Sequence, residues 1–282
     1  MFAICAYGDS PYLEACIRSL KAQSCPAPII LCTSTPSTFL ESMAANYGLP
    51  YHVREGDGGI ARDWNFALEC ADARLVTIAH QDDRYHRQYA RWVQWVWGRH
   101  PDTSVMMTDA VVVRDVAREP GGDAPTARAK GGVGNTPSKI KPARADIYCA
   151  IKRLLRLPLR FRTWCDRAWV KRAALVLGNP IFCPSCTYDK EMVGQGLFDA
   201  SYRFALDWDA LWRLAEAPGR FVCLEKPLLC YRIHGGAATK ASIEDHSRRE
   251  EELRMFRRIW PAPVAALLGR CYGAAQGSYK EH

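Results

Sequence analysis

The sequence has no long uninterrupted run of apolar residues. Its longest apolar pieces, around Trp92–Trp97 and Ala173–Leu177, fall far short of the roughly eighteen residues that a transmembrane helix needs. The opening residues, MFAICAYGDSPYLEA, contain neither a basic start nor a cleavable apolar core, so we expect no signal peptide. These absences predict a cytoplasmic protein that does not cross a membrane.

The sequence also lacks a second cysteine pair that could complete a zinc site. Cys183 and Cys186, in CPSC, have the spacing of half a zinc site or of a redox pair. Cys223 and Cys230 do not supply the other half of a zinc site, and a thioredoxin-like context for redox chemistry is missing. We therefore expect the 12 cysteines to be reduced and mostly to fill small apolar spaces.

Aromatic residues interleaved with basic ones, at the spacing of single-strand nucleic-acid binders, are absent as well. The net charge is nevertheless +8, which favours anionic partners such as nucleic acid, membrane headgroups or phosphorylated substrates. Lys and Arg are dense in residues 139–172. A catalytically silent basic protein that binds anionic lipid or nucleic acid therefore stays open as an alternative to the enzyme described below, for which we expect no nucleic-acid partner.

The sequence does contain a regular alternation of short apolar strands and helices. The expected strands are Phe2–Tyr7, Ile29–Cys32, Tyr51–Arg54 and Leu75–Ala79. The expected helices are Leu13–Leu20, Thr38–Tyr47, Ala61–Cys70 and His86–Trp97. Alternation at this pace predicts an α/β fold, with a Rossmann-like, mostly parallel sheet flanked by helices.

Polar side chains follow the expected strands where each one ends. Tyr7, Thr33 and the segment Gln81–Asp83 lie at carboxyl ends, where the ligands of parallel sheets bind. The adjacent carboxylates of Asp82 and Asp83 suit Mn²⁺ or Mg²⁺, which complete their coordination with water and substrate phosphate. The alternative is that these acids only cap the following helix.

Composition divides the chain into five segments. They are a first half of the α/β domain in 1–114, a flexible loop or linker in 115–146, a basic amphipathic insert in 147–179, a second half of the domain in 180–240 and a helical tail in 241–282. Within the insert, IKRLLRLPLRFRTWCDRAWVKR alternates leucines and aromatics with basic residues. This pattern fits a helix on an anionic membrane surface, or an ordinary helix pair with a solvated basic face.

Acidic and basic side chains reappear in the second half of the domain. Asp207 opens the amphipathic segment LDWDALWRLA, where a carboxylate can take a proton from a hydroxyl. Arg232 and His234 leave a later strand in YRIHGG, where they can meet phosphate or metal. The informative feature is their order, with acids after the fourth strand, then an acid before a helix, then a basic strand end.

In these segments the chain resembles a family 2 glycosyltransferase with the GT-A fold. AYGDSPYLEACIRSLKAQS resembles the opening strand and helix of that family, and GGIARDWNFALECADARLVTIAHQDDRY resembles the stretch from its glycine-rich loop through its Asp-x-Asp motif. LFDASYRFALDWDALWRLA resembles its general-base segment, and LLCYRIHGG resembles its closing YRxH segment. The first half, 1–114, then corresponds to the nucleotide-sugar-binding half of a GT-A domain, and 180–240 to its acceptor and catalytic-base half.

The resemblance implies roles for residues on the donor side. Tyr7 falls where the first strand of the family contacts the donor base, and Asn65 matches an asparagine near the donor. Asp83 would be the metal ligand, and Asp82 would touch the sugar or ribose. His234 matches a histidine that completes the metal site in some members.

The resemblance also implies the reaction. Asp207 matches the catalytic base of inverting members, and Trp208 and Asp209 would line the acceptor side. The predicted enzyme is metal-dependent, with Mn²⁺ or Mg²⁺, and moves a hexosyl-type sugar from a nucleotide-diphosphate sugar, a UDP-sugar first of all, to a hydroxyl. The expected acceptor is a saccharide or polyprenyl-linked saccharide in bacterial-type surface polysaccharide synthesis. The basic insert would then contact the inner face of the cell membrane.

The sequence departs from the family pattern at several places. The turn after the second strand reads TSTPST and has no acid of the kind that holds uracil in the family. Asp63-Trp64-Asn65 stands where Ala-Arg-Asn is usual. His80 replaces the first acid of the Asp-x-Asp-Asp form, and Leu206 precedes the base in place of an acid. We therefore predict a distinct subfamily. A sugar nucleotidyltransferase is disfavoured because AYGDSPY lacks a glycine-rich loop with a basic residue.

Overall fold

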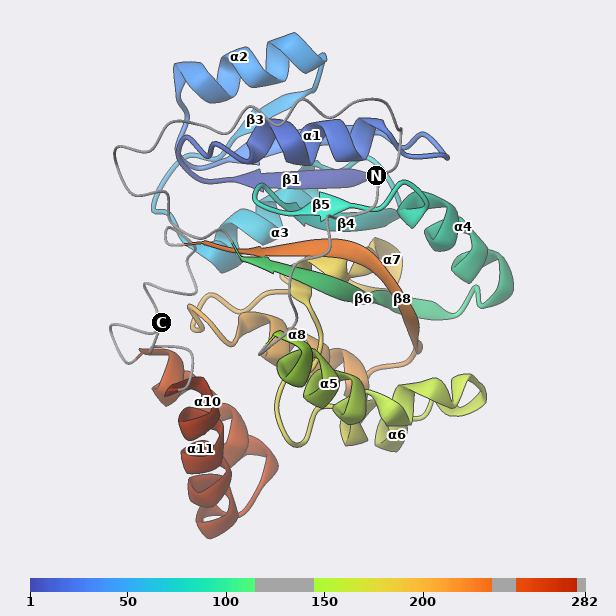
Figure 1. Ribbon diagram of the computed structural model, residues 1–282, viewed down its shortest axis with the longest axis vertical. Coiled ribbons are helices and arrows are strands. Elements are labelled where there is room, and N and C mark those ends of the chain that lie inside the picture. The colour runs from blue at the N-terminus through green and yellow to red at the C-terminus, as the bar shows by residue number, and fades with distance from the viewer. Residues whose placement is uncertain (115–144, 235–246, 278–282) are drawn as a thin grey trace.

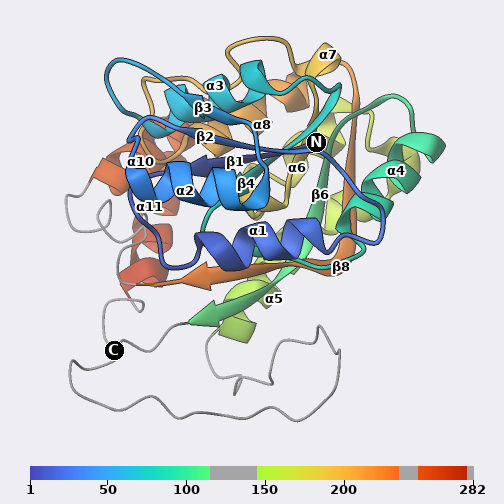
Figure 2. The ribbon, with the colours of Figure 1, turned by 90° about the horizontal axis from the view of Figure 1, so that it is seen from above.

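Figure 1 shows the computed structural model, which describes residues 1–114, 145–234 and 247–277. A mixed sheet of eight strands, in the order β3-β2-β1-β4-β7-β6-β8-β5, runs through this part of the chain. The strands are β1 (Phe2–Ala6), β2 (Ile29–Thr33), β3 (Tyr51–Val53), β4 (Leu75–His80), β5 (Arg84–Tyr85), β6 (Thr103–Arg114), β7 (Thr187–Asp189) and β8 (Arg220–Ile233). Helices lie on both sides of the sheet, and buried side chains form a separate core layer on each face (Figures 1 and 2).

The first four strands form the parallel half of the sheet, as the sequence predicts. β1 lies between β2 and β4, with Phe2 opposite Ile29 on one side and Thr77 on the other. β3 continues the parallel pairing beyond β2. Because these strands run in the same direction, the residues that follow β1, β2 and β4 meet at one edge of the sheet.

The second half of the sheet is partly antiparallel. β7 is antiparallel to both β4 and β6, and β8 is parallel to β6 and antiparallel to β5. The sequence pattern predicts two strands here, Phe221–Leu224 and Leu228–Ile233, separated by Pro227. That prediction is wrong, because β8 is continuous from Arg220 to Ile233. Pro227 lies opposite Asp109 at a register shift, and this bulge accommodates a residue that has no N–H to donate.

The helices of the first half lie close to their predicted positions. They are α1 (Leu13–Lys21), α2 (Thr38–Tyr47), α3 (Ile60–Cys70) and α4 (Tyr89–Arg99). The Ser37 side chain caps α2 by accepting a hydrogen bond from the Leu40 N–H, and Gly48 ends the helix with a φ of 59°. α4 begins later than predicted because the backbone N–H of His86 still donates to the carbonyl of Leu228 in β8, at 2.9 Å.

The insert and the tail are helical where they are described. The insert contains α5 (Ala145–Leu155), η1 (Leu157–Arg160), η2 (Arg162–Trp164) and α6 (Ala168–Ala173). The second half of the domain contributes η3 (Cys183–Ser185), α7 (Lys190–Val193) and α8 (Leu206–Glu216), and the tail contributes α10 (Ser247–Ile259) and α11 (Ala262–Gly277). The predicted loop at 115–146 lies almost entirely outside the described residues. No helix within the described ranges combines the length and the apolar character that a membrane crossing requires.

Candidate active site

Asp83 lies just after β4 and is buried, with 2% of its surface exposed. Its Oδ1 accepts a 2.8 Å hydrogen bond from the backbone N–H of Arg232 in β8. Its Oδ2 has no hydrogen-bond partner among the described residues. Burial raises the pKa of this carboxyl well above its usual range. Asp83 therefore ties the end of β4 to β8 from within the protein.

Asp82 keeps 23% of its side chain exposed and joins a cluster of polar and aromatic groups. Its Oδ1 accepts a 2.9 Å hydrogen bond from Ser10 Oγ, and its Oδ2 lies 3.0 Å from His234 Nε2, within ion-pair distance. Arg232 Nε donates to the backbone carbonyl of Asp82 at 3.1 Å. The ring of Tyr12 lies against both basic groups, 4.4 Å from the Arg232 guanidinium and 4.9 Å from the His234 ring. The loop after β1 and the ends of β4 and β8 therefore meet at this cluster.

Tyr7 stands at the end of β1 with 68% of its surface exposed. The side chain of Gln81 holds its backbone on both sides. The Tyr7 N–H donates to Gln81 Oε1 at 3.3 Å, and Gln81 Nε2 donates to the Tyr7 carbonyl at 2.9 Å. The backbone is thus fixed while the ring remains in solvent, an arrangement that suits stacking on a planar ligand.

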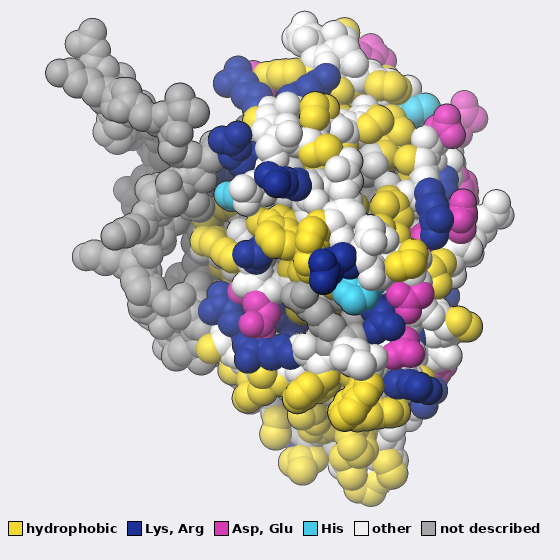
Figure 3. All heavy atoms as spheres, turned by 90° about the vertical axis from the view of Figure 1, so that its right-hand side faces the viewer, with side chains coloured by type: hydrophobic (Ala, Val, Ile, Leu, Met, Phe, Trp, Pro, Cys, Tyr) yellow, Lys and Arg dark blue, Asp and Glu magenta, His cyan; other side chains and the backbone are white. Residues whose placement is uncertain are grey.

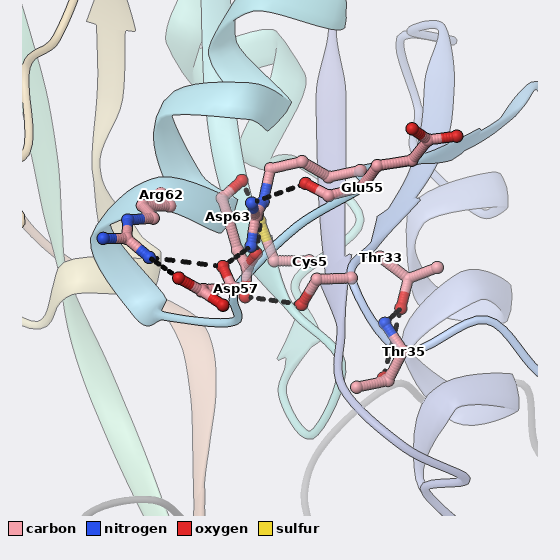
Figure 4. A network of polar contacts seen from close by, with 9 residues as sticks. Cys5, Thr33, Thr35, Glu55, Asp57, Arg62 and Asp63 are labelled. Carbon is pink, nitrogen blue, oxygen red and sulfur yellow. Dashed lines mark hydrogen bonds and ion pairs between the residues drawn. The ribbon is translucent and has the colours of Figure 1, made fainter.

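A polar network occupies the carboxyl ends of β2 and β3 (Figure 4). Asp63, from the first turn of α3, accepts hydrogen bonds from Arg54 Nε at 2.9 Å and from Ser34 Oγ at 3.0 Å. The hydroxyls of Thr33 and Thr35 lie 3.3 Å apart in the same turn. Asp63 therefore brings a carboxylate to the TSTPST turn, which has none of its own. The sequence showed that Asp63 departs from the usual Ala-Arg-Asn. It did not show that this aspartate would lie beside the TSTPST turn.

Asp207 opens α8, and both of its carboxylate oxygens accept hydrogen bonds. Asn179 Nδ2 donates to Oδ2 at 2.8 Å, and the Trp208 N–H donates to Oδ1 at 2.7 Å. Burial raises the pKa of Asp207 to about 6, and this rise is opposed by the Trp208 hydrogen bond and by the charge of Lys152. Such a carboxyl is ionised at neutral pH yet basic enough to accept a proton.

Cys183 links the surroundings of Asp207 to the strand ends. Its thiol lies within electrostatic reach of both Asp207 and Cys5, the latter in β1. The neighbouring Phe182 packs on Tyr231, which lies near the end of β8, with ring centroids 5.4 Å apart. Cys183 and Phe182 therefore connect the surroundings of Asp207 with β1 and the end of β8.

The CPSC pair has the character of core residues. Cys183 and Cys186 are both free and buried. Burial raises the pKa of both thiols, that of Cys186 to about 12. A reactive cysteine needs a lowered pKa, so these environments oppose thiol chemistry and agree with the expected packing role.

Comparison with known proteins gives a match in structure only. No protein-family model matches the sequence, and no curated protein matches it. Among the solved structures that match is the mannosyltransferase PcManGT from Pyrobaculum calidifontis, in complex with GDP-Man and Mn²⁺, with 15% identity, a TM-score of 0.58, and coverage of 100% of this chain and 75% of that one. S. aureus TarS in complex with UDP-GlcNAc matches with 13% identity and a TM-score of 0.55 over 99% of this chain and 72% of that one. The chain has the GT-A fold.

A third match agrees with this assignment. Glucosyl-3-phosphoglycerate synthase from Mycobacterium tuberculosis, in complex with Mn²⁺ and UDP-Glc, has 10% identity and a TM-score of 0.53, over 89% of this chain and 76% of that one. The resemblance seen in the sequence is thus confirmed for the fold. At these identities the similarity extends to the GT-A architecture and not to the identity of a substrate.

The residues present can be tested against the divalent ion found in two of these GT-A complexes. Within the described ranges, no group of three or more His, Cys, Asp or Glu side chains is arranged to hold a metal ion. Asp82 Oδ2 and His234 Nε2, however, lie 3.0 Å apart. Two adjacent ligands of an octahedral ion, each about 2.1 Å from it, are also about 3 Å apart, and Mg²⁺ commonly takes only one or two protein ligands. The pair therefore fits such an ion, whereas Asp83 is turned inward.

Asn65, expected near the donor of a GT-A enzyme, holds a neighbouring segment. Its Nδ2 donates to the carbonyl of Phe198 at 2.8 Å, and its Oδ1 accepts from the N–H of Phe198 at 2.9 Å. Both ends of the amide are thus used to fix the chain shortly before α8. Asn65 therefore fixes the segment that precedes α8, the helix that carries Asp207.

Trp208 and Asp209, expected on the acceptor side, lie in the core. Trp208 is 2% exposed, and its indole N–H donates to the carbonyl of Leu175 at 3.1 Å. Asp209 is 1% exposed and forms ion pairs with Arg213 at 2.8 Å and Arg258 at 2.5 Å. These contacts give both residues a part in anchoring α8 against its neighbours.

Sequence reasoning missed four residues that complete the two polar clusters. Ser10 and Tyr12 flank Asp82 and His234, while Asn179 and Lys152 surround Asp207. Ser10 and Tyr12 lie in the matched opening segment but outside its strand. Asn179 and Lys152 belong to the insert, outside every motif, so no sequence signal pointed to them.

Proposed function

We propose that the protein is an inverting family 2 glycosyltransferase that moves a sugar from a nucleotide-diphosphate sugar to an acceptor hydroxyl. One observation carries this proposal above the others. The GT-A fold carries both the Asp82–His234 pair at the strand ends and the half-buried carboxyl of Asp207 at the start of α8. The reaction needs stabilisation of an anionic leaving group and a group that accepts a proton. The Asp82–His234 pair can serve the first need through a divalent ion, and Asp207 can serve the second.

On the donor side, we assign the nucleoside to the ends of β1 and β2. The exposed ring of Tyr7 offers a stacking surface, and the Asp63 carboxylate with Arg54 offers hydrogen-bonding groups for the base edge. Two of the similar structures contain UDP-sugars and one contains GDP-Man. We therefore place UDP-sugars first among donors and GDP-sugars second.

At the diphosphate, we assign Asp82 and His234 to the divalent ion and Arg232 to a phosphate oxygen. The observed contacts favour Asp82 over Asp83 for this role, because Asp83 is buried and already accepts the N–H of Arg232. When bound, Mn²⁺ or Mg²⁺ would supply positive charge to the departing diphosphate. The guanidinium of Arg232, held by the carbonyl of Asp82, contributes a second positive charge at the same place.

At the acceptor, Asp207 takes the proton of the attacking hydroxyl. Its pKa of about 6 keeps most of the carboxylate ionised at pH 7. The acceptor oxygen forms the new bond to the anomeric carbon as the bond to the diphosphate breaks on the opposite face, so the configuration inverts. The proton ends on Asp207 and the electron pair on the leaving diphosphate.

We propose a saccharide or polyprenyl-linked saccharide as acceptor, with the insert against an anionic membrane. Phe161, Trp164 and Trp169 are 64%, 53% and 63% exposed. Their successive ring centroids lie 6.3 and 6.2 Å apart. We call these residues the aromatic triad. Figure 3, which views the side where α4 and α6 lie, shows hydrophobic and basic side chains together on that face. Exposed aromatics beside Lys and Arg are typical of peripheral membrane contacts.

A donor panel tests the proposed function. The purified protein is incubated with UDP-, GDP- and dTDP-sugars, with Mn²⁺ or with EDTA, and nucleotide release is followed. We expect metal-dependent release from one nucleotide class, and its loss in Asp207→Asn when an acceptor saccharide is present. Salt-sensitive binding to anionic lipid or nucleic acid, without turnover of any donor, would instead favour a catalytically silent basic protein.

A further inference from the structure

We propose that Asn179 and Lys152 are positioning residues that hold the Asp207 carboxylate toward the acceptor, so that the basic insert forms part of the active site. The inference rests on the proposed function, because it assigns a task to the surroundings of the base. It concerns residues that lie outside every motif that the sequence shares with the glycosyltransferase family.

Two hydrogen bonds connect the insert to the base. Lys152 Nζ, on α5, donates to the carbonyl of Asn179 at 2.9 Å. Asn179 Nδ2 donates to Asp207 Oδ2 at 2.8 Å. The backbone N–H of Ile181 donates to Asn179 Oδ1 at 3.0 Å, which sets the orientation of the amide and keeps Nδ2 toward the carboxylate. Displacing Lys152 would therefore release the segment that holds Asp207.

The burial of Lys152 indicates a task beyond folding. The residue is 7% exposed, and its ammonium lies 4.8 Å from the ring centroid of Phe182. Burial lowers its pKa to about 7, while the charge of Asp207 opposes that shift. Apolar residues of similar volume often stabilise a protein more than buried charged groups do. A lysine at this position is therefore explained better by its charge near Asp207 than by packing.

Several other titratable groups face Asp207. Arg248 of α10 is a second cation within electrostatic reach. Cys183, Cys186 and Tyr188 also lie within reach, and burial raises the pKa of each, so they remain neutral at the working pH. Lys152 is thus the cation from the insert that favours the ionised form of Asp207. Removing it, or the Asn179 hydrogen bond, should raise the pKa of the base.

The test is the pH profile of donor turnover in Lys152→Met and Asn179→Ala, with the acceptor saccharide from the donor panel. Activity needs ionised Asp207 and is lost as the pH falls through its pKa. We expect the acidic limb of the kcat profile to move upward by about one pH unit in both variants, with about a fivefold loss of kcat at pH 6 and recovery toward pH 9. The KM for the donor should change little, because neither residue lies in the donor cluster.

Matched variants separate positioning from stability. Lys152→Arg keeps the positive charge, so the acidic limb of its kcat profile should stay near the wild-type pH. Lys171 is also fully buried, but it donates to carbonyls in and beyond the last turn of α8. Lys171→Met should therefore lower the Tm without moving the limb. An unchanged limb in folded Lys152→Met and Asn179→Ala would overturn the inference.

A second measurement needs no substrate. The carboxyl carbons of ¹³C-labelled protein are titrated by NMR, and the Asp207 signal is assigned as the one missing from Asp207→Asn. We expect the pKa of Asp207 to rise by about one unit in Lys152→Met. If no donor is turned over, the proposed function fails, but this titration still tests whether Lys152 lowers the pKa of Asp207. An unaltered Asp207 titration in the folded variant would overturn the link even if turnover is found.

Discussion

At the scale of single residues, two neighbouring aspartates have different surroundings. Asp83 is turned inward and accepts the backbone N–H of Arg232, whereas Asp82 faces Ser10 and His234. Both acids lie in the turn between β4 and β5, where the N–H of Asp83 donates to the carbonyl of His80 at 3.2 Å. One acid of the pair is therefore available to a ligand, and the other supports the sheet. The sequence alone assigned the metal to Asp83, and the contacts lead us to propose Asp82.

Substituting each aspartate by asparagine separates the two assignments. We expect Asp82→Asn to abolish the Mn²⁺-dependent part of nucleotide binding, because a charged ligand is lost, and to leave the Tm nearly unchanged. Asp83→Asn should keep most of that binding, since its amide oxygen can still accept the Arg232 N–H. Thermal shift measured with UDP and Mn²⁺ checks both. The reverse pattern would restore Asp83 as the ligand.

The task of Asp207 has a pH signature. Its pKa is raised to about 6, and a base works only when ionised, so kcat should rise with pH through this value and then level off. Asp207→Asn should lower kcat by about a thousandfold at pH 8, within the range for general-base catalysis, with nucleotide affinity preserved. Rapid-quench measurements across pH 5–9 check this. A residual rate above a tenth of wild type would contradict the assignment.

At the scale of elements, the tail holds the helix that carries the base. Glu251 of α10 accepts backbone hydrogen bonds from Arg203, Phe204 and Ala205, each at 2.8 Å, just before α8 begins. A carboxylate at this position satisfies N–H groups near a helix start and complements the helix dipole. Glu251→Ala should cost about 2 kcal/mol of stability, measured by urea unfolding. The exposed neighbour supplies the control, and Glu250→Ala should change stability by less than about 0.5 kcal/mol.

The insert gives a second prediction at the element scale. Replacing Trp164 and Trp169 by serine removes two exposed rings of the aromatic triad, and the fold should tolerate this. We expect at least a tenfold loss of binding to vesicles with anionic lipid, measured by co-sedimentation, and no change in Tm. Leu267→Ser, on α11 and with 61% of the residue exposed, serves as a control and should bind the vesicles as wild type does. Equal vesicle binding by wild type and the double variant would remove the membrane proposal.

At the scale of the whole molecule, the sequence predicted the parallel half of the sheet well. Short apolar strands that alternate with helices have few other topologies, and their carboxyl ends had to meet at one edge of the sheet. The antiparallel β7 and the continuous β8 were not predictable in this way, because β7 has three residues and β8 contains Pro227. Whether such segments form strands depends on pairing with strands that are far away in the sequence.

The candidate site was predictable to the same extent. Residues at strand ends, including Asp82 and His234, were found because their positions follow from topology. The direction in which each side chain points was not predictable, because it depends on which neighbouring group donates a hydrogen bond to each carboxylate oxygen. The contacts of Asn179 and Lys152 with the base region come from an insert whose placement no motif describes.

The central claim is that this GT-A fold holds a nucleotide-diphosphate donor through Asp82. Calorimetric titration of the full chain with UDP, in Mn²⁺ and in EDTA, tests it most directly when wild type and Asp82→Asn are measured side by side. We expect UDP binding by wild type to strengthen at least tenfold with Mn²⁺, and no such strengthening in the variant. If UDP and GDP both fail to bind in any condition, or if the variant binds them as wild type does, the assigned donor site is wrong.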